Sequence, residues 1–218
     1  MVDNENKLKE ILDVFHKEGI LDNVILIGSW SLLFYKNIFE NFNPLVRTTD
    51  IDFYIPNVKS IKSRKNLVSS LKEINYDVIH DTLTNKSTFI SPDGFELEFL
   101  TKLNRDNLSC VKVGNSGIYA ESLSYVEIYS DNYIEVEYNG IIVKVASPSS
   151  YLLQKLLINE DRKDKKEKDI ESINHVLSYV NASKKYQTEL ACLYNSLPKK
   201  WKRRINEVII KNNIDIKL

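Results

Sequence analysis

The chain has 218 residues, 43% of them hydrophobic, and its 30 basic side chains balance 30 acidic ones. This composition is typical of a globular protein with a sizeable core, in one large domain or two small ones. No apolar run approaches the roughly 18 residues of a membrane span, and we expect no signal peptide. The two cysteines are far apart and form no Cys-x-x-Cys pair, which excludes a disulfide scaffold and indicates a cytoplasmic protein.

The charges are unevenly distributed along the chain. Residues 1–145 carry 15 basic and 21 acidic side chains, whereas residues 146–218 carry 15 basic and 9 acidic ones. Such an asymmetry suits a cleft in which metal-binding carboxylates face a phosphate-binding surface. A chance asymmetry on a solvated surface would look the same. We predict two domains with these boundaries.

The first half of the chain alternates helices and strands. Helical spacing of apolar residues predicts a helix over 5–18, which Gly19 ends. A short buried strand at 23–28 leads directly into a helix that Gly28-Ser29 opens. A second strand covers 50–55, and a further helix is predicted from 58 to 74.

The second half begins with strands and ends with helices. Strands are predicted at 76–80, 87–91 and 95–101, and 133–145 reads as a hairpin with Asn139-Gly140 in a type I′ turn. Ser147-Pro148 is a helix N-cap and N1 pair, after which the chain looks helical to its end. The fold class is therefore α+β, a mixed sheet flanked by helices with a C-terminal helical region.

The strand at 50–55 carries two carboxylates in the sequence "RTTDIDFYI". Asp50 and Asp52 are two residues apart, so in a strand both project from the same face. Like charges this close raise each other's pKa unless a cation lies between them or water surrounds them. The pair is therefore a candidate metal site, although exposed edge strands also carry such pairs by chance.

The Gly28-Ser29 step is a candidate phosphate site. Free backbone N–H groups at a helix start attract anions, although a Gly-Ser between strand and helix is more often only a tight turn. The absence of Gly-Lys-Ser/Thr excludes a Walker P-loop. Followed by Asp-x-Asp on the next strand, the step would place a phosphate beside a two-metal platform.

This order of motifs resembles the nucleotidyltransferase superfamily of DNA polymerase β. In detail the chain is similar to bacterial predicted nucleotidyltransferases related to AbiEii-type toxins, over roughly residues 20 to 180. The stretches that carry the resemblance are "LIGSWSLLFY", "RTTDIDFYI", "GFELEFLTKL" and "VKVASPSSYLLQKLLINEDRKDKKEKDIESI". It implies a nucleotidyltransferase core at 1–145 and a helical domain at 146–218.

The family places a third carboxylate on a neighbouring strand. Glu96 and Glu98 both alternate with apolar residues, so periodicity does not separate them, and the resemblance of "LEFLT" to the family pattern selects Glu98. Glu135 and Glu137 form a rival pair on the later hairpin. Asp50, Asp52 and Glu98 are thus the predicted catalytic residues and ligands of Mg²⁺ or Mn²⁺.

The resemblance also assigns nucleotide-binding residues beside Gly28 and Ser29. They are Lys155, Arg162 and Asp169, although most of the run "DRKDKKEKD" would serve equally well as a solvated turn. Arg47, three residues before Asp50, is a further candidate, which either reaches the triphosphate or only caps the loop. Lys155 lies in an almost wholly apolar helix, where a cation needs an anionic partner. We predict that this partner is the phosphate of the nucleotide, with Asp169 as the alternative.

The predicted function is transfer of a nucleoside monophosphate from an NTP to an acceptor hydroxyl. The acceptor classes considered are RNA, tRNA above all because of the basic run "KKWKRR", and protein. The resemblance also raises a toxin role with an antitoxin partner. Two alternatives are a non-catalytic nucleotide-binding or regulatory module with the same fold and a manganese-dependent glycosyltransferase.

Overall fold

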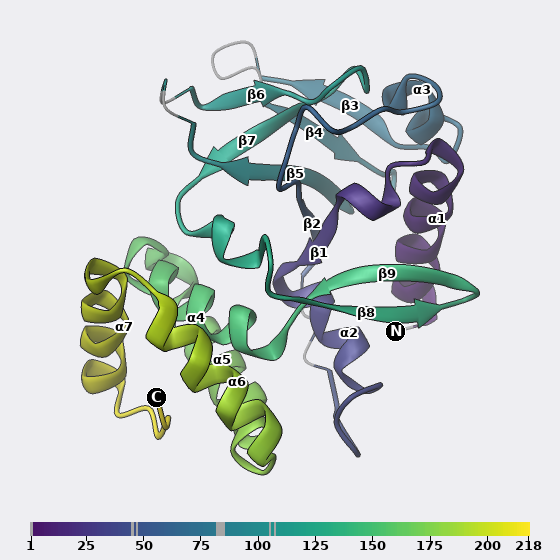
Figure 1. Cartoon of the computed structure of the whole chain (residues 1–218). Coiled ribbons are helices and arrows are strands. Elements are labelled where there is room, and N and C mark those ends of the chain that lie inside the picture. Colours follow the sequence, from purple (N-terminus) through teal and green to yellow (C-terminus); the bar gives the residue numbers. More distant parts are fainter. Residues whose placement is uncertain (1, 45, 47, 82–85, 105, 107) are drawn as a thin grey trace.

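The computed structural model describes residues 2–44, 46, 48–81, 86–104, 106 and 108–218. A mixed sheet forms the body of the molecule, with α1 and α3 along one side and α4 to α7 gathered as a separate group below it (Figure 1). None of the helices in this described part is long and apolar enough to cross a lipid bilayer. The α-helices are α1 (Val2–Glu18), α2 (Leu32–Tyr35), α3 (Leu67–Lys72), α4 (Pro148–Ile158), α5 (Lys166–Asn181), α6 (Lys184–Ser196) and α7 (Lys199–Asn212).

The sheet has nine strands in the described residues, and seven of them follow the order β3-β4-β5-β2-β1-β9-β8. β2 runs parallel to β5 and antiparallel to β1. β7 continues the edge of β5 beyond β4, and β6 pairs with β7. The strands are β1 (Ile25–Ile27), β2 (Asp50–Tyr54), β3 (Asp77–His80), β4 (Ser87–Ile90), β5 (Glu96–Lys102), β6 (Cys110–Lys112), β7 (Tyr119–Leu123), β8 (Tyr133–Tyr138) and β9 (Ile141–Ala146).

The hydrophobic core extends from the sheet to the C-terminal helices, and one part of it lies between the sheet and α1. Ile51 and Phe53 alternate with the two aspartates of β2 and are completely buried. The Phe53 ring meets Phe15 of α1 edge to face, with 4.8 Å between the ring centroids. Burial of one face of β2 therefore fixes its register and directs both aspartates to the other face.

Several predictions from the sequence are confirmed, beginning with the α+β class, the helix at 5–18 and the 133–145 hairpin. Asn139 and Gly140 both have positive φ, +50° and +80°, as a type I′ turn requires. The Ser147 side chain caps α4 by accepting a hydrogen bond from the backbone N–H of Ser150, and Pro148 begins the helix.

The helix predicted over 58–74 is wrong in its first half. Only α3 is helical, with Asn66 as its N-cap. The buried carboxylate of Glu18 accepts hydrogen bonds from the Ser63 hydroxyl at 3.0 Å and the Lys65 N–H at 2.6 Å. These contacts hold 63–65 in a non-helical conformation, so a tertiary anchor overrides the local helical pattern.

Two strands, β6 and β7, were not predicted. β6 has three residues, and β7 reads Tyr-Ala-Glu-Ser-Leu, which contains no β-branched residue. Their pairing with the end of β5 makes them strands. They matter because they bring a further carboxylate, Glu121, to the edge of β5.

Candidate active site

A cleft of about 710 Å³ separates the start of β2 and β5 from α4 and α5. Its size is that of a small-molecule site. Every residue predicted to act in this protein lines it, except Arg47, which lies outside the described residues. These residues are Gly28, Ser29, Asp50, Asp52, Glu98, Lys155, Arg162 and Asp169.

Strand pairing assembles the carboxylates on the floor of the cleft. In the parallel pair β2–β5, Asp50 lies beside Glu96 and Asp52 beside Glu98. Residues paired across neighbouring strands point to the same face, so four carboxylates gather on one surface. Both glutamates line the cleft. The rival pair, Glu135 and Glu137, is exposed on β8 at the far edge of the sheet.

Gly28 brings the backbone close to Asp52. Because β1 and β2 are antiparallel, Ile27 pairs with Asp52, and Gly28 follows directly. Gly28 has a φ of +66°, and a Cβ added there would stand 2.8 Å from the Asp52 Oδ2. Only glycine combines this backbone conformation with so close an approach. The bulky Trp30 does not obstruct the cleft, because its side chain is buried beside Phe95.

Asp52 sits in a field of like charge. Burial, and after it the carboxylates of Glu98 and Asp50, raise the pKa of Asp52 from 3.8 to about 7. Lys155 and Arg162 act in the opposite direction without offsetting the rise. The floor of the cleft therefore favours a bound cation or proton at Asp52.

Glu98 is held by a lysine that the sequence analysis did not single out. Lys86 Nζ lies 2.8 Å from Glu98 Oε1 and 2.7 Å from Glu121 Oε2. Burial lowers the pKa of Lys86, but hydrogen bonds to Glu121 and Glu98 outweigh that effect and raise it above its ordinary value. The three groups meet because β4 and β7 occupy the same edge of β5 in succession.

On the opposite wall, Lys155 pairs with Asp169. Their Nζ and Oδ1 atoms are 2.8 Å apart, and both side chains are more than nine-tenths buried. The guanidinium of Arg162 approaches the same Oδ1 at 3.5 Å. Burial lowers the pKa of Lys155 despite the neighbouring carboxylate. In this structure Lys155 thus pairs with Asp169, which was the alternative to the nucleotide phosphate in the prediction from the sequence.

Lys165 is a further cleft residue that the sequence analysis did not select. It pairs with Asp50 across the cleft, with 3.3 Å between Nζ and Oδ2. It belongs to the charged run "DRKDKKEKD", in which spacing alone does not distinguish one lysine from the next. Its pairing with Asp50 depends on the tertiary structure, because the 3-10 segment Lys163–Lys165 comes close to the start of β2 only in the folded chain.

The carboxylates suit a divalent cation in their chemistry. Carboxylate oxygens are the ligands that Mg²⁺ and Mn²⁺ prefer. Among the residues that the structure describes, however, no three His, Cys, Asp or Glu side chains are grouped so as to hold a metal ion. Glu98 is turned to Lys86 and Asp50 to Lys165. The donors therefore suit the metal chemically, and two of them, Asp50 and Glu98, pair with lysines in this structure.

A cleft floored by carboxylates from parallel strands and approached by a glycine turn has the donors through which divalent cations assist phosphoryl transfer. The family model described as Nucleotidyltransferase matches residues 6–197. The chain belongs to this family and is a nucleotidyltransferase enzyme, which leaves both alternatives, the non-catalytic module and the glycosyltransferase, without support. A search of curated proteins found no match.

Solved structures with the same fold include an antibiotic-resistance factor. The solution structure of ANT(2'')-Ia is 13% identical in sequence to this chain and has a TM-score of 0.53. The match covers 94% of this chain and 95% of ANT(2'')-Ia. The crystal structure of ANT(2")-Ia in complex with adenylyl-2"-tobramycin is 14% identical, covers 89% of this chain and 98% of its own, and has a TM-score of 0.54. These likenesses show the nucleotidyltransferase fold.

Proposed function

We propose that this enzyme transfers a nucleoside monophosphate from an NTP to an acceptor hydroxyl with the help of Mg²⁺ or Mn²⁺. The observation that carries the proposal is the β2–β5 register, which lays Asp52 beside Glu98 and Asp50 beside Glu96 on the cleft floor. The raised pKa of Asp52 supports it, because a bound cation would relieve the repulsion that causes the rise.

Asp50, Asp52 and Glu98 would hold the metal. When bound, it supplies charge neutralisation at the phosphates and lowers the pKa of the acceptor hydroxyl. Glu98 is the candidate base for the proton of that hydroxyl. To act as this base, Glu98 would leave its ion pair with Lys86 and turn to the metal and the acceptor.

The phosphates would lie between the two walls. Gly28 and Ser29 line the sheet side and would contribute backbone N–H groups, while Arg162 and Lys165 line the helical side and would contribute cations. Lys155 pairs with Asp169, which also contacts Arg162. Lys155 would therefore position Asp169 and Arg162 and would not bind the phosphates itself.

For the acceptor we favour a small hydroxyl-bearing molecule over tRNA or protein. The cleft has the volume of a small-molecule site. In the basic run at 199–204, which suggested RNA, three of the five basic side chains have partners within the chain: Lys202 donates to the Asn195 carbonyl, Arg203 pairs with Glu207, and Arg204 pairs with Asp161. ANT(2")-Ia, whose structure holds an adenylylated antibiotic, is a precedent of the same fold.

The test is transfer of label from each α-labelled NTP in the presence of Mg²⁺ or Mn²⁺. Acceptors would be tried as separate pools: aminoglycosides and other polyols, total tRNA, and protein. We expect labelled product with one pool and a loss of more than about a hundredfold in Asp52→Asn, because removal even of supporting groups costs 10- to 100-fold at metal sites. Label incorporation that Asp52→Asn leaves intact would contradict the proposal.

A relation to AbiEii-type toxins, and with it an antitoxin partner, stays a prediction from the sequence. Growth arrest on expression, relieved by a neighbouring gene product and absent in Asp52→Asn, would support it. Transfer to an antibiotic or another small polyol without growth arrest would contradict it.

A further inference from the structure

Part of the cleft lining is apolar and differs from the ionic floor. Leu100, Leu123, Val126 and Ile158 line the cleft, together with the half-buried Tyr125. The charged triphosphate gains nothing from contact with apolar side chains. A flat heterocycle gains from such contact, because it can bury its faces against apolar and aromatic groups.

The backbone of Tyr125 is strained. It has a φ of +69° and a ψ of −3°. A bulky non-glycine residue in this left-handed region is uncommon and persists only where surrounding contacts hold it. Such outliers are frequent at ligand clamps, which makes Tyr125 a candidate for a role in binding.

The ring is braced from behind by α7. The Arg204 guanidinium lies over the Tyr125 ring, 5.2 Å from its centroid, and the Trp201 ring meets Tyr125 edge to face at 5.2 Å. Tyr125 is among the residues that line the cleft, and neither Arg204 nor Trp201 is. Tyr125 therefore contacts the brace and also borders the cleft.

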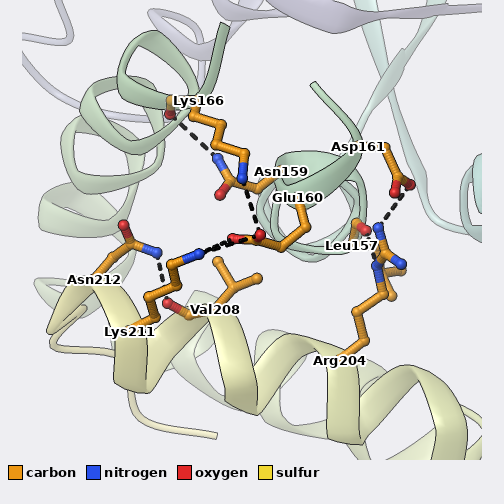
Figure 2. A network of polar contacts seen from close by, with 9 residues as sticks. All are labelled: Leu157, Asn159, Glu160, Asp161, Lys166, Arg204, Val208, Lys211 and Asn212. Atoms are coloured by element: carbon orange, nitrogen blue, oxygen red, sulfur yellow. Dashed lines mark hydrogen bonds and ion pairs between the residues drawn. The ribbon is translucent and has the colours of Figure 1, made fainter. Parts of the chain in front are cut away.

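The brace is itself fixed to the rest of the helical domain. Arg204 reaches from α7 to the end of α4, where it donates to the Leu157 carbonyl and pairs with Asp161 at 2.6 Å (Figure 2). Farther along α7, Lys211 pairs with Glu160 at 3.0 Å, and Glu160 also binds Lys166 at 2.9 Å. Figure 2 shows how these contacts tie α7 to the segment that follows α4.

We propose that Tyr125, held by Arg204 and Trp201, is the stacking platform for the base of the NTP, and that Arg204 is its positioning residue. This inference rests on the proposed function and names the part of the cleft that reads the base. With one face supported by Arg204 and its backbone already constrained, the ring loses little freedom when a base stacks on its other face. Stacking of this kind tolerates different bases, because each has a π-face.

The test compares a ligand with a base to one without. The dissociation constants of a non-hydrolysable NTP analogue and of inorganic tripolyphosphate would be measured by calorimetry in Mg²⁺. Tyr125→Gly, which removes the ring and relieves the backbone strain, should weaken the nucleotide analogue roughly tenfold, as base–aromatic stacking predicts. It should leave the affinity for tripolyphosphate unchanged, and Tyr125→Phe should bind both ligands as the unaltered protein does.

Arg204 has a matched control in its neighbour. Arg204→Met should weaken the nucleotide analogue selectively, whereas Arg203→Met should not, because Arg203 is highly exposed and pairs with Glu207 on the same helix. Equal weakening of nucleotide and tripolyphosphate by Tyr125→Gly would overturn the inference, as would an unchanged affinity for the nucleotide analogue. Those results leave the proposed function intact, whereas failure of the unaltered protein to bind any NTP would overturn both.

Discussion

The two walls of the cleft handle charge in opposite ways. On the sheet side, strand register crowds carboxylates together, and the pKa of Asp52 rises to about 7. On the helical side, Lys155 and Asp169 are buried and paired with each other at 2.8 Å. The buried charge pair of the helical wall is therefore balanced within the protein, whereas the sheet wall is arranged so that a cation would stabilise it.

This difference assigns a structural role to the helical wall and a metal-binding role to the sheet wall. Removal of one partner from a buried ion pair costs more folding stability than the intact pair contributes. Lys155 and Asp169 therefore have a structural role in the helical wall. Crowded carboxylates are costly to the folded protein, and such costs concentrate at functional sites. We therefore expect substitutions on the helical side to change stability first and those on the sheet side to change metal binding and activity first.

The largest effect on stability is expected from Lys155→Met. The substitution leaves Asp169 buried with its main partner gone, and its Oδ2 already lacks a hydrogen-bond partner in the described structure. We expect a loss of roughly 3–5 kcal/mol in the free energy of unfolding, measured by urea denaturation without metal. The double variant Lys155→Met/Asp169→Leu should recover most of it. Unchanged stability with weakened NTP binding would instead make the nucleotide phosphate the partner of Lys155.

A smaller effect is expected from the protonation of Asp52. The folded protein binds this proton more tightly than the unfolded chain does, because the pKa is raised from 3.8 to about 7. Stability without metal should therefore fall as pH rises from about 4 to about 7 and then level off. Asp52→Asn should remove this fall and be more stable than the unaltered protein at pH 8, on the order of 2 kcal/mol. Chemical denaturation in EDTA across this pH range measures it, and parallel profiles would contradict it.

The smallest effect is expected from Lys86→Met. Its ammonium pairs with Glu98 and Glu121, so its removal makes the carboxylate cluster more negative. Affinity for Mg²⁺ should rise several-fold at low ionic strength, since a nearby cation opposes a second one. Calorimetric titration with Mg²⁺ measures this change. Lys102→Met, at the exposed end of β5, is the control. Weaker Mg²⁺ binding would show that Lys86 orients Glu98 for the metal.

The central part of the site was predictable from the sequence because it depends on backbone periodicity. Two-residue spacing places Asp50 and Asp52 on one strand face whatever the rest of the fold does. The order of buried strand, Gly28 turn and second strand likewise follows from local patterns. The cap at Ser147 and the turn at Asn139-Gly140 are local in the same sense.

Contacts between segments far apart in the chain were decided only by the tertiary structure. Lys86 meets Glu98 because β4 and β7 share one edge of β5, and Arg204 reaches Tyr125 because α7 folds back over the end of α4. The segment before α3 is held out of a helix by Glu18, which lies more than forty residues earlier. Strand order and helix packing set these pairings, and no period in the sequence encodes which lysine faces which carboxylate.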